Sequence, residues 1–70
     1  MGLRLFVFID GDEIAAFPAS AVPRAGETLW LKTLDTEATV IVDDVEHQLD
    51  RSSPDTYGGH DVCLYCRRKN

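Results

Sequence analysis

Short runs of aromatic and β-branched residues, separated by turn residues, constrain the fold of this chain more than any other feature. The first run, LRLFVFI at Leu3–Ile9, is typical of a β-strand. It is followed by Asp10-Gly11, a strong signal for a tight hairpin because both residues tolerate positive φ. We therefore expect the chain to turn back at once and to place a second strand beside the first.

The rest of the chain repeats this alternation of strand and turn signals. EIAAF at 13–17 predicts the returning strand, ended by Pro18, and a single helical turn over the same residues is the alternative because Ala and Glu favour helices. A loop with three punctuating residues follows (Pro18, Pro23 and Gly26). Further strands are expected at 27–34, 37–49 and 61–69, with a tight turn at 35–37 and a long loop at 50–60.

Four to five short strands predict an all-β fold, a small barrel or sandwich, and the sequential hairpins suggest an antiparallel meander. Seventy residues make a single domain, 1–70. A chain of this size buries only ~60% of the surface that its unfolded form exposes. We therefore expect an additional source of stability, such as a disulfide, a metal, a very well packed core or a second copy of the chain.

One stretch resembles a known family. VPRAGETLWL, starting at Val22, is similar to the P-x-x-G-[DE]-x-hydrophobic entry of small SH3-like β-barrels, in which a Pro-Gly turn leads into a strand of the barrel. The long strand that follows ends in V-x-H, Val45 to His47, which is also similar to small bacterial proteins of unassigned function. The resemblance covers residues 22–47 and implies the fold alone, because this architecture carries many unrelated functions.

Several strands are apolar on both faces, which a sheet with one solvated face does not require. Alternation puts the aliphatic residues of Leu3–Ile9 on one face and two Phe residues on the other, and it puts Val40 and Val42 opposite Val45. Aromatic residues are enriched at protein–protein contacts. The surplus aromatic residues predict an interface at Phe6, Phe8, Trp30 and Tyr65. A small secondary core beneath the loops is the alternative.

An interface of this kind predicts a homo-oligomer, and a dimer in particular, because two-fold pairs are the commonest symmetric assembly. Another protein is the alternative partner. Nucleic acid is excluded as a partner by the net charge of −5, because three of the seven basic residues lie in the tail 67–69 and the others would not neutralise phosphates. An anionic membrane is excluded for the same reason, and the run Leu5–Ile9 is too short to span a bilayer. The expected location is cytoplasmic.

The two cysteines stand in a C-x-x-C spacing that suggests a metal or redox site. On a strand, however, Cys63 and Cys66 project from opposite faces with Cα atoms ~10 Å apart. This distance is too large for a disulfide, and the opposite faces prevent both sulfurs from reaching one tetrahedral metal. Two reduced cysteines, one of them buried, are expected, with no cofactor. If a metal is held, the ligand set is His60, Cys63, Cys66 and His47.

No catalytic constellation is present in the sequence, so a non-enzymatic protein is expected. The predicted function is a protein-interaction or self-associating β-barrel. The alternative is a small-molecule site between the 50–60 loop and the barrel mouth, lined by Trp30, His47, Tyr57 and His60. His47 and His60 flank this loop, which brings them near each other. A zinc-stabilised module is the third reading.

Overall fold

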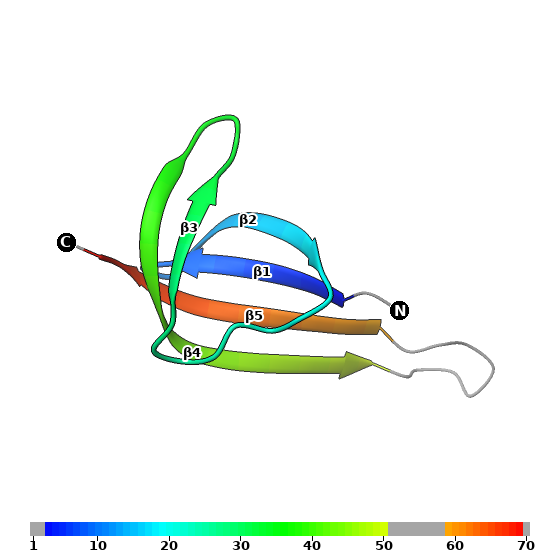
Figure 1. Cartoon of the computed structure of the whole chain (residues 1–70). Helices are drawn as coiled ribbons and strands as arrows, with labels where there is room; N and C mark the ends of the chain where they lie inside the picture. Colours follow the sequence, from blue (N-terminus) through cyan, green and yellow to red (C-terminus); the bar gives the residue numbers. More distant parts are fainter. Residues whose placement is uncertain (1–2, 51–58, 70) are drawn as a thin grey trace.

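The computed structural model describes residues 3–50 and 59–69, and this part of the chain consists of five β-strands without a helix. The strands curl into an open half-barrel (Figure 1). Their bounds are β1 Leu3–Ile9, β2 Asp12–Ala19, β3 Thr28–Lys32, β4 Glu37–Asp50 and β5 Gly59–Arg68. The prediction of a small all-β, barrel-like fold is confirmed. Of the predicted 50–60 loop, Asp50 belongs to β4, and Gly59 and His60 belong to β5. Residues 51–58, which include Tyr57, lie outside the described residues.

The strand order across the sheet is β2-β1-β5-β4-β3, and the sheet is mixed. Three neighbouring pairs are antiparallel, as expected, but β1 and β5 run parallel. The expected meander would have placed β2 beside β3. Instead, residues 20–27 cross the open side of the sheet, and β5 pairs with β1 on one side and β4 on the other (Figure 1). Local turn signals do not encode this long-range placement.

The β1–β2 hairpin forms as predicted. Asp10 and Gly11 both have positive φ, 52° and 86°, as a two-residue primed turn requires. The strand reading of 13–17 is confirmed over the helical turn, and β2 continues through Pro18 to Ala19. Pro18 is tolerated because β2 is an edge strand, where a missing backbone N–H need not break the ladder.

A β-bulge in β4 changes which side chains face the core. The pairing with β5 shifts between Val42 and Asp44, so that Val42 lies opposite Cys66 and Val45 lies opposite Leu64. Val45 therefore shares the inner face with Val42, and the prediction that they oppose each other is wrong. The extra residue, Asp43, is left out of the ladder and accepts a hydrogen bond from Arg67 Nε at 2.9 Å. Bulges bend strands, and β4 curves where its pairing passes from β3 to β5 (Figure 1).

The core lies on the inner, concave face of the half-barrel. The inner side chains of β1, β5 and β4 supply most of it, and the five that are almost fully buried are Val7, Val40, Val42, Val62 and Leu64. Among the described residues, no charged or polar side chain is buried. β5 is central because it pairs along almost its whole length with β4 and over six residues with β1.

Candidate functional site

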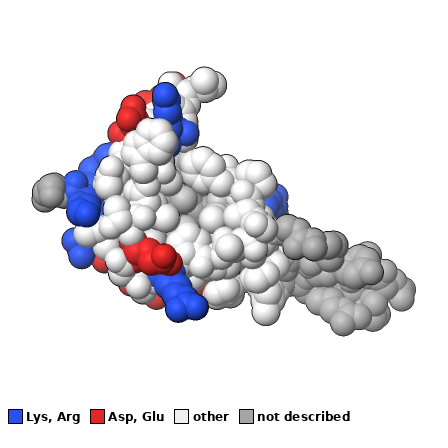
Figure 2. All heavy atoms as spheres, in the orientation of Figure 1, with Lys and Arg blue, Asp and Glu red and all other residues white. Residues whose placement is uncertain are grey.

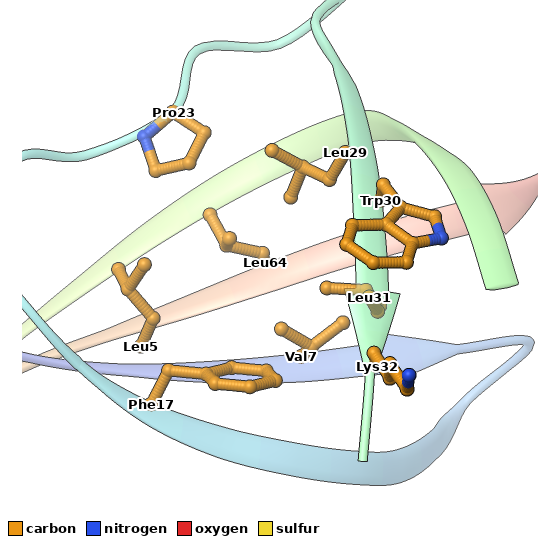
Figure 3. A pocket seen from close by; sticks show the side chains of 9 residues that line it. All are labelled: Leu5, Val7, Phe17, Pro23, Leu29, Trp30, Leu31, Lys32 and Leu64. Carbon is orange, nitrogen blue, oxygen red and sulfur yellow. The ribbon is translucent and has the colours of Figure 1, made fainter. Parts of the chain in front are cut away.

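The half-barrel leaves an apolar groove open on its concave face. The floor is formed by Leu5 and Val7 from β1 and Leu64 from β5, and a pocket of about 360 Å³ lies above them. Phe17 from the β2 edge forms one wall, while Leu29 and Leu31 from the β3 edge form the other. In Figure 3, Leu29 and Leu31 point from β3 across the groove toward Leu64 and Val7. The groove exists because the two edge strands face each other without pairing.

The rim of the groove is completed by Pro23, Trp30 and Lys32. Trp30 is 63% exposed, although its indole Nε1 donates a 3.3 Å hydrogen bond to Glu37. Lys32 is the single charged side chain that the described residues contribute to the lining. In the orientation of Figure 1, the hollowed face is almost free of charge, and the acidic and basic side chains gather at its margins (Figure 2). The groove thus offers a mostly apolar surface with one lysine at its rim, on a chain whose net charge is −5.

The two sheet edges that border this groove differ in how they are protected. Natural edge strands discourage unwanted pairing with proline, bulges and charged residues. β2 has all three: Pro18, a register shift opposite Val7 and Phe8, and the acidic pair Asp12 and Glu13. β3 reads TLWLK, pairs with β4 without a register shift and has one charged residue, Lys32. β3 is therefore the edge that is open to pairing.

Three of the four predicted interface residues lie together on the outer, convex face. Phe8 and Tyr65 are stacked with ring centroids 5.3 Å apart, and Phe6 is next to Phe8 on the same face of β1. Arg4 covers Phe6, with its guanidinium carbon 5.4 Å from the ring centroid, and forms a two-bond ion pair with Asp61. Arg4 therefore covers part of the Phe6 ring, while Tyr65 is 36% exposed.

Tyr65 is fixed within this convex cluster by its hydroxyl group, which donates a 3.2 Å hydrogen bond to Glu46. Partial desolvation raises the pKa of this hydroxyl, and the hydrogen bond to the Glu46 carboxylate and the charge of that carboxylate raise it further. The phenol therefore stays protonated and acts as a donor. This hydrogen bond ties β5 to β4 on the outer face.

Trp30, the fourth predicted interface residue, lies apart from the other three. It pairs with Thr39, whose carbonyl oxygen accepts the Lys69 N–H, so Trp30 is level with the end of β5. Tyr65 is four residues back along β5 and two strands across. At ~3.3 Å per residue and ~4.8 Å per strand, the two backbone positions are ~16 Å apart. Trp30 belongs to the groove rim, and the convex cluster is a separate surface.

The two histidines are brought together, as the sequence predicts. His47 Nδ1 and His60 Nε2 are 3.0 Å apart and the ring centroids are 5.3 Å apart. The two rings therefore meet head-on, which is the geometry of one imidazole N–H donating to the other ring. To hold one metal ion, the lone pairs of His47 Nδ1 and His60 Nε2 would both have to point at a single position away from the line that joins the two nitrogens. His47 also lines a second cavity, of about 470 Å³, with Arg24 and Asp44, whereas Trp30 lines the groove.

The strand reading of the C-x-x-C segment is confirmed. Cys66 lies opposite Ile9 and Val42 on the inner face, while Cys63 lies opposite Phe6 and Glu46 on the outer face. Both thiols are free, and both are buried, whereas the sequence predicted only one. Cys63 is covered because its small side chain lies between larger neighbours. Residues 3–50 and 59–69 contain no group of three or more potential metal ligands.

Burial governs the chemistry of both thiols. Desolvation raises the pKa of Cys63, and the nearby Glu46 carboxylate raises it further. Desolvation also raises the pKa of Cys66, with a smaller contribution from Asp43. A nucleophilic cysteine needs the opposite shift, toward the thiolate. The geometry therefore favours a structural role for these two side chains.

The groove itself was missed by the sequence reasoning, which treated the aliphatic faces as core. Phe17 and Pro23 line it, although the sequence patterns indicated only a strand residue at Phe17 and a turn residue at Pro23. The available signal was the contrast between the two edge strands, because β2 has a proline and two acidic residues whereas β3 has a single lysine. The contrast can be recognised only after the strand order has shown that β2 and β3 are the edges of the sheet.

Comparison with known proteins gives no match to a protein family, a curated protein or a solved structure. The described part of the chain also has no helix of the length and apolarity needed to cross a membrane.

Proposed function

We propose that this chain is a non-enzymatic protein-interaction module that binds an extended apolar protein segment, or a second copy of itself, at the concave groove. The observation that carries the proposal is an apolar pocket of about 360 Å³ bordered by two unpaired strand edges. Proteins that bind by adding a strand combine these two elements, because the free edge supplies backbone hydrogen bonds and the adjacent pocket selects side chains.

The chemistry of the lining supports protein binding over catalysis. Among the described residues, the lining has one charged group, Lys32, and no nucleophile, acid–base pair or thiol. Trp30, at the rim, is of the residue type most enriched at the energetic centres of protein interfaces. The convex cluster has less free aromatic surface to offer, because Arg4 and Glu46 engage it.

Trp30 provides the test, because it is the one tryptophan in the chain and stands at the rim. Short peptides with alternating apolar residues should shift its fluorescence emission to shorter wavelength as they bind. Leu29→Asp, which puts a carboxylate in the groove wall, should weaken this binding at least tenfold. Leu34→Asp is the matched control, because Leu34 is fully exposed and does not line the groove. Equal binding by both variants, folded by circular dichroism, would sink the proposal.

A further inference from the structure

The free edge of β3 presents its backbone groups in a definite pattern. Thr33 N–H donates to the Thr36 carbonyl at 2.7 Å, and Val42 N–H donates to the Glu27 carbonyl at 2.9 Å. In an antiparallel ladder, residues that bond to the neighbouring strand alternate with residues whose N–H and C=O point away. Residues 27, 29, 31 and 33 therefore bond toward β4. Thr28, Trp30 and Lys32 direct their N–H and C=O groups outward, away from the sheet.

We infer that two copies of the chain pair through these edges, with antiparallel β3 strands related by a two-fold axis at Trp30. The inference deepens the proposed function and rests on it, since it names a second copy as the partner. In this register Trp30 faces Trp30 of the other copy, and Thr28 faces Lys32. All three have outward-pointing backbone groups. Two hydrogen bonds at the central pair and two at each flanking pair make about six in all.

The side chains of β3 are complementary to themselves in this register. Leu29 of one copy faces Leu31 of the other on the concave side, so the apolar groove continues across the two-fold axis. The two Trp30 side chains, each 63% exposed in the single chain, lie beside each other across the two-fold axis. Lys32 faces Thr28, so no like charges are opposed. A shift of the strands by one residue would put Leu29 opposite Trp30 and mismatch the faces of the two sheets.

The same pairing is unavailable to β2, the other edge. Pro18 lacks a backbone N–H, the register shift interrupts a regular ladder, and Asp12 and Glu13 would add acidic charge to a chain of net charge −5. The assembly therefore closes as a dimer through one edge of each copy instead of continuing as a filament.

Cysteine cross-linking tests the register directly. In a hydrogen-bonded antiparallel pair the Cα atoms are ~5.5 Å apart, within disulfide range. Trp30→Cys should therefore form a covalent dimer on mild oxidation, and so should an equimolar mixture of Thr28→Cys and Lys32→Cys. Thr28→Cys alone should not, because residues 28 of the two copies are ~14 Å apart. The native thiols do not compete, since both are buried. This register would be overturned if Thr28→Cys formed a covalent dimer on its own and the mixture of Thr28→Cys and Lys32→Cys formed none between the two variants.

Proline substitution tests the pairing without disturbing the fold. Thr28→Pro removes an outward N–H but no bond to β4, so the monomer should keep its β-sheet circular dichroism. Its dimer dissociation constant should rise at least about tenfold, because two hydrogen bonds are lost by symmetry. Thr28→Val is the matched control and should remain dimeric by native mass spectrometry.

The outcomes separate the dimer from the proposed function. A wild-type dimer that Thr28→Pro leaves intact would overturn edge pairing and move self-association to another surface. A wild-type monomer at high concentration would overturn the dimer itself. In both cases the peptide-induced shift of Trp30 fluorescence still decides whether the groove binds protein segments.

Discussion

Individual side chains in this protein follow the alternation of their strands, and their burial sets their energetic weight. Leu64 is completely buried at the centre of β5, where it lies opposite both Val7 and Val45. Leu34 is completely exposed in the turn between β3 and β4. The same residue type therefore has opposite roles in one small chain.

Truncation of these two leucines should show the difference. Leu64→Ala should lower the free energy of unfolding by about 2–5 kcal/mol, because it removes buried methyl groups and leaves a cavity. Leu34→Ala should change it by less than about 0.5 kcal/mol, as is usual at exposed positions. Urea denaturation followed by circular dichroism measures both. Equal effects of the two substitutions would contradict the core described above.

The raised thiol pKa values predict a loss of stability in alkaline solution. The unfolded chain releases its thiol protons near the ordinary value of 9.0, whereas folded Cys63 and Cys66 hold them to higher pH. The stability associated with the two thiols is thus complete below pH 9 and falls as pH rises through and above that value. Replacing both cysteines with Ala should flatten the alkaline limb of the stability–pH profile. An unchanged limb would assign the loss to other groups.

At the scale of the elements, turns and bulges decide how the strands meet. The hairpin between β1 and β2 depends on two consecutive residues with positive φ, Asp10 and Gly11. The bulge in β4 keeps Val42 and Val45 on one face although their spacing is odd. The hairpin was readable from the Asp-Gly pair. The bulge had a weaker signal in the odd spacing of the valines, which strict alternation misread.

Substitution at the turn should separate backbone strain from side-chain chemistry. Gly11→Val forces a β-branched residue into the left-handed region and should cost at least about 1–2 kcal/mol. Asp10→Asn is the control and should be close to neutral, because Asn-Gly is favoured in this turn. Thermal unfolding checks both variants. A neutral Gly11→Val would mean that the turn adopts another conformation in solution.

At the scale of the whole molecule, the sheet has a well-supported centre and two unlike edges. β1, β5 and β4 are each paired on both sides, whereas β2 and β3 are paired on one. Local opening is easiest where backbone hydrogen bonds are exposed and contacts are few. The stability of the molecule should therefore decrease from β5 toward both edges.

Hydrogen exchange should follow this gradient. The amides of β5, which is paired with a strand on each side, should exchange most slowly. The amides of Thr28, Trp30 and Lys32, which point away from β4, should be among the fastest in dilute protein. Raising the protein concentration should slow exchange at these three amides if the β3 edges pair. Exchange rates at β3 that do not depend on concentration, in a protein shown to be dimeric, would place the interface elsewhere.

The sequence by itself determined the strands of this protein, the β1–β2 turn and most strand faces, because these depend on interactions among residues close together in the chain. It also indicated that Cys63 and Cys66 lie on opposite faces, since an odd spacing has this effect on a strand without a bulge, and β5 pairs with β1 over these residues without a register shift. Only the tertiary structure decided that β5 lies between β1 and β4 and that β2 and β3 are the edges. These pairings join residues far apart in sequence, and no local pattern specifies which distant strand is a neighbour. The groove, its rim at Trp30 and the open edge of β3 all follow from that order.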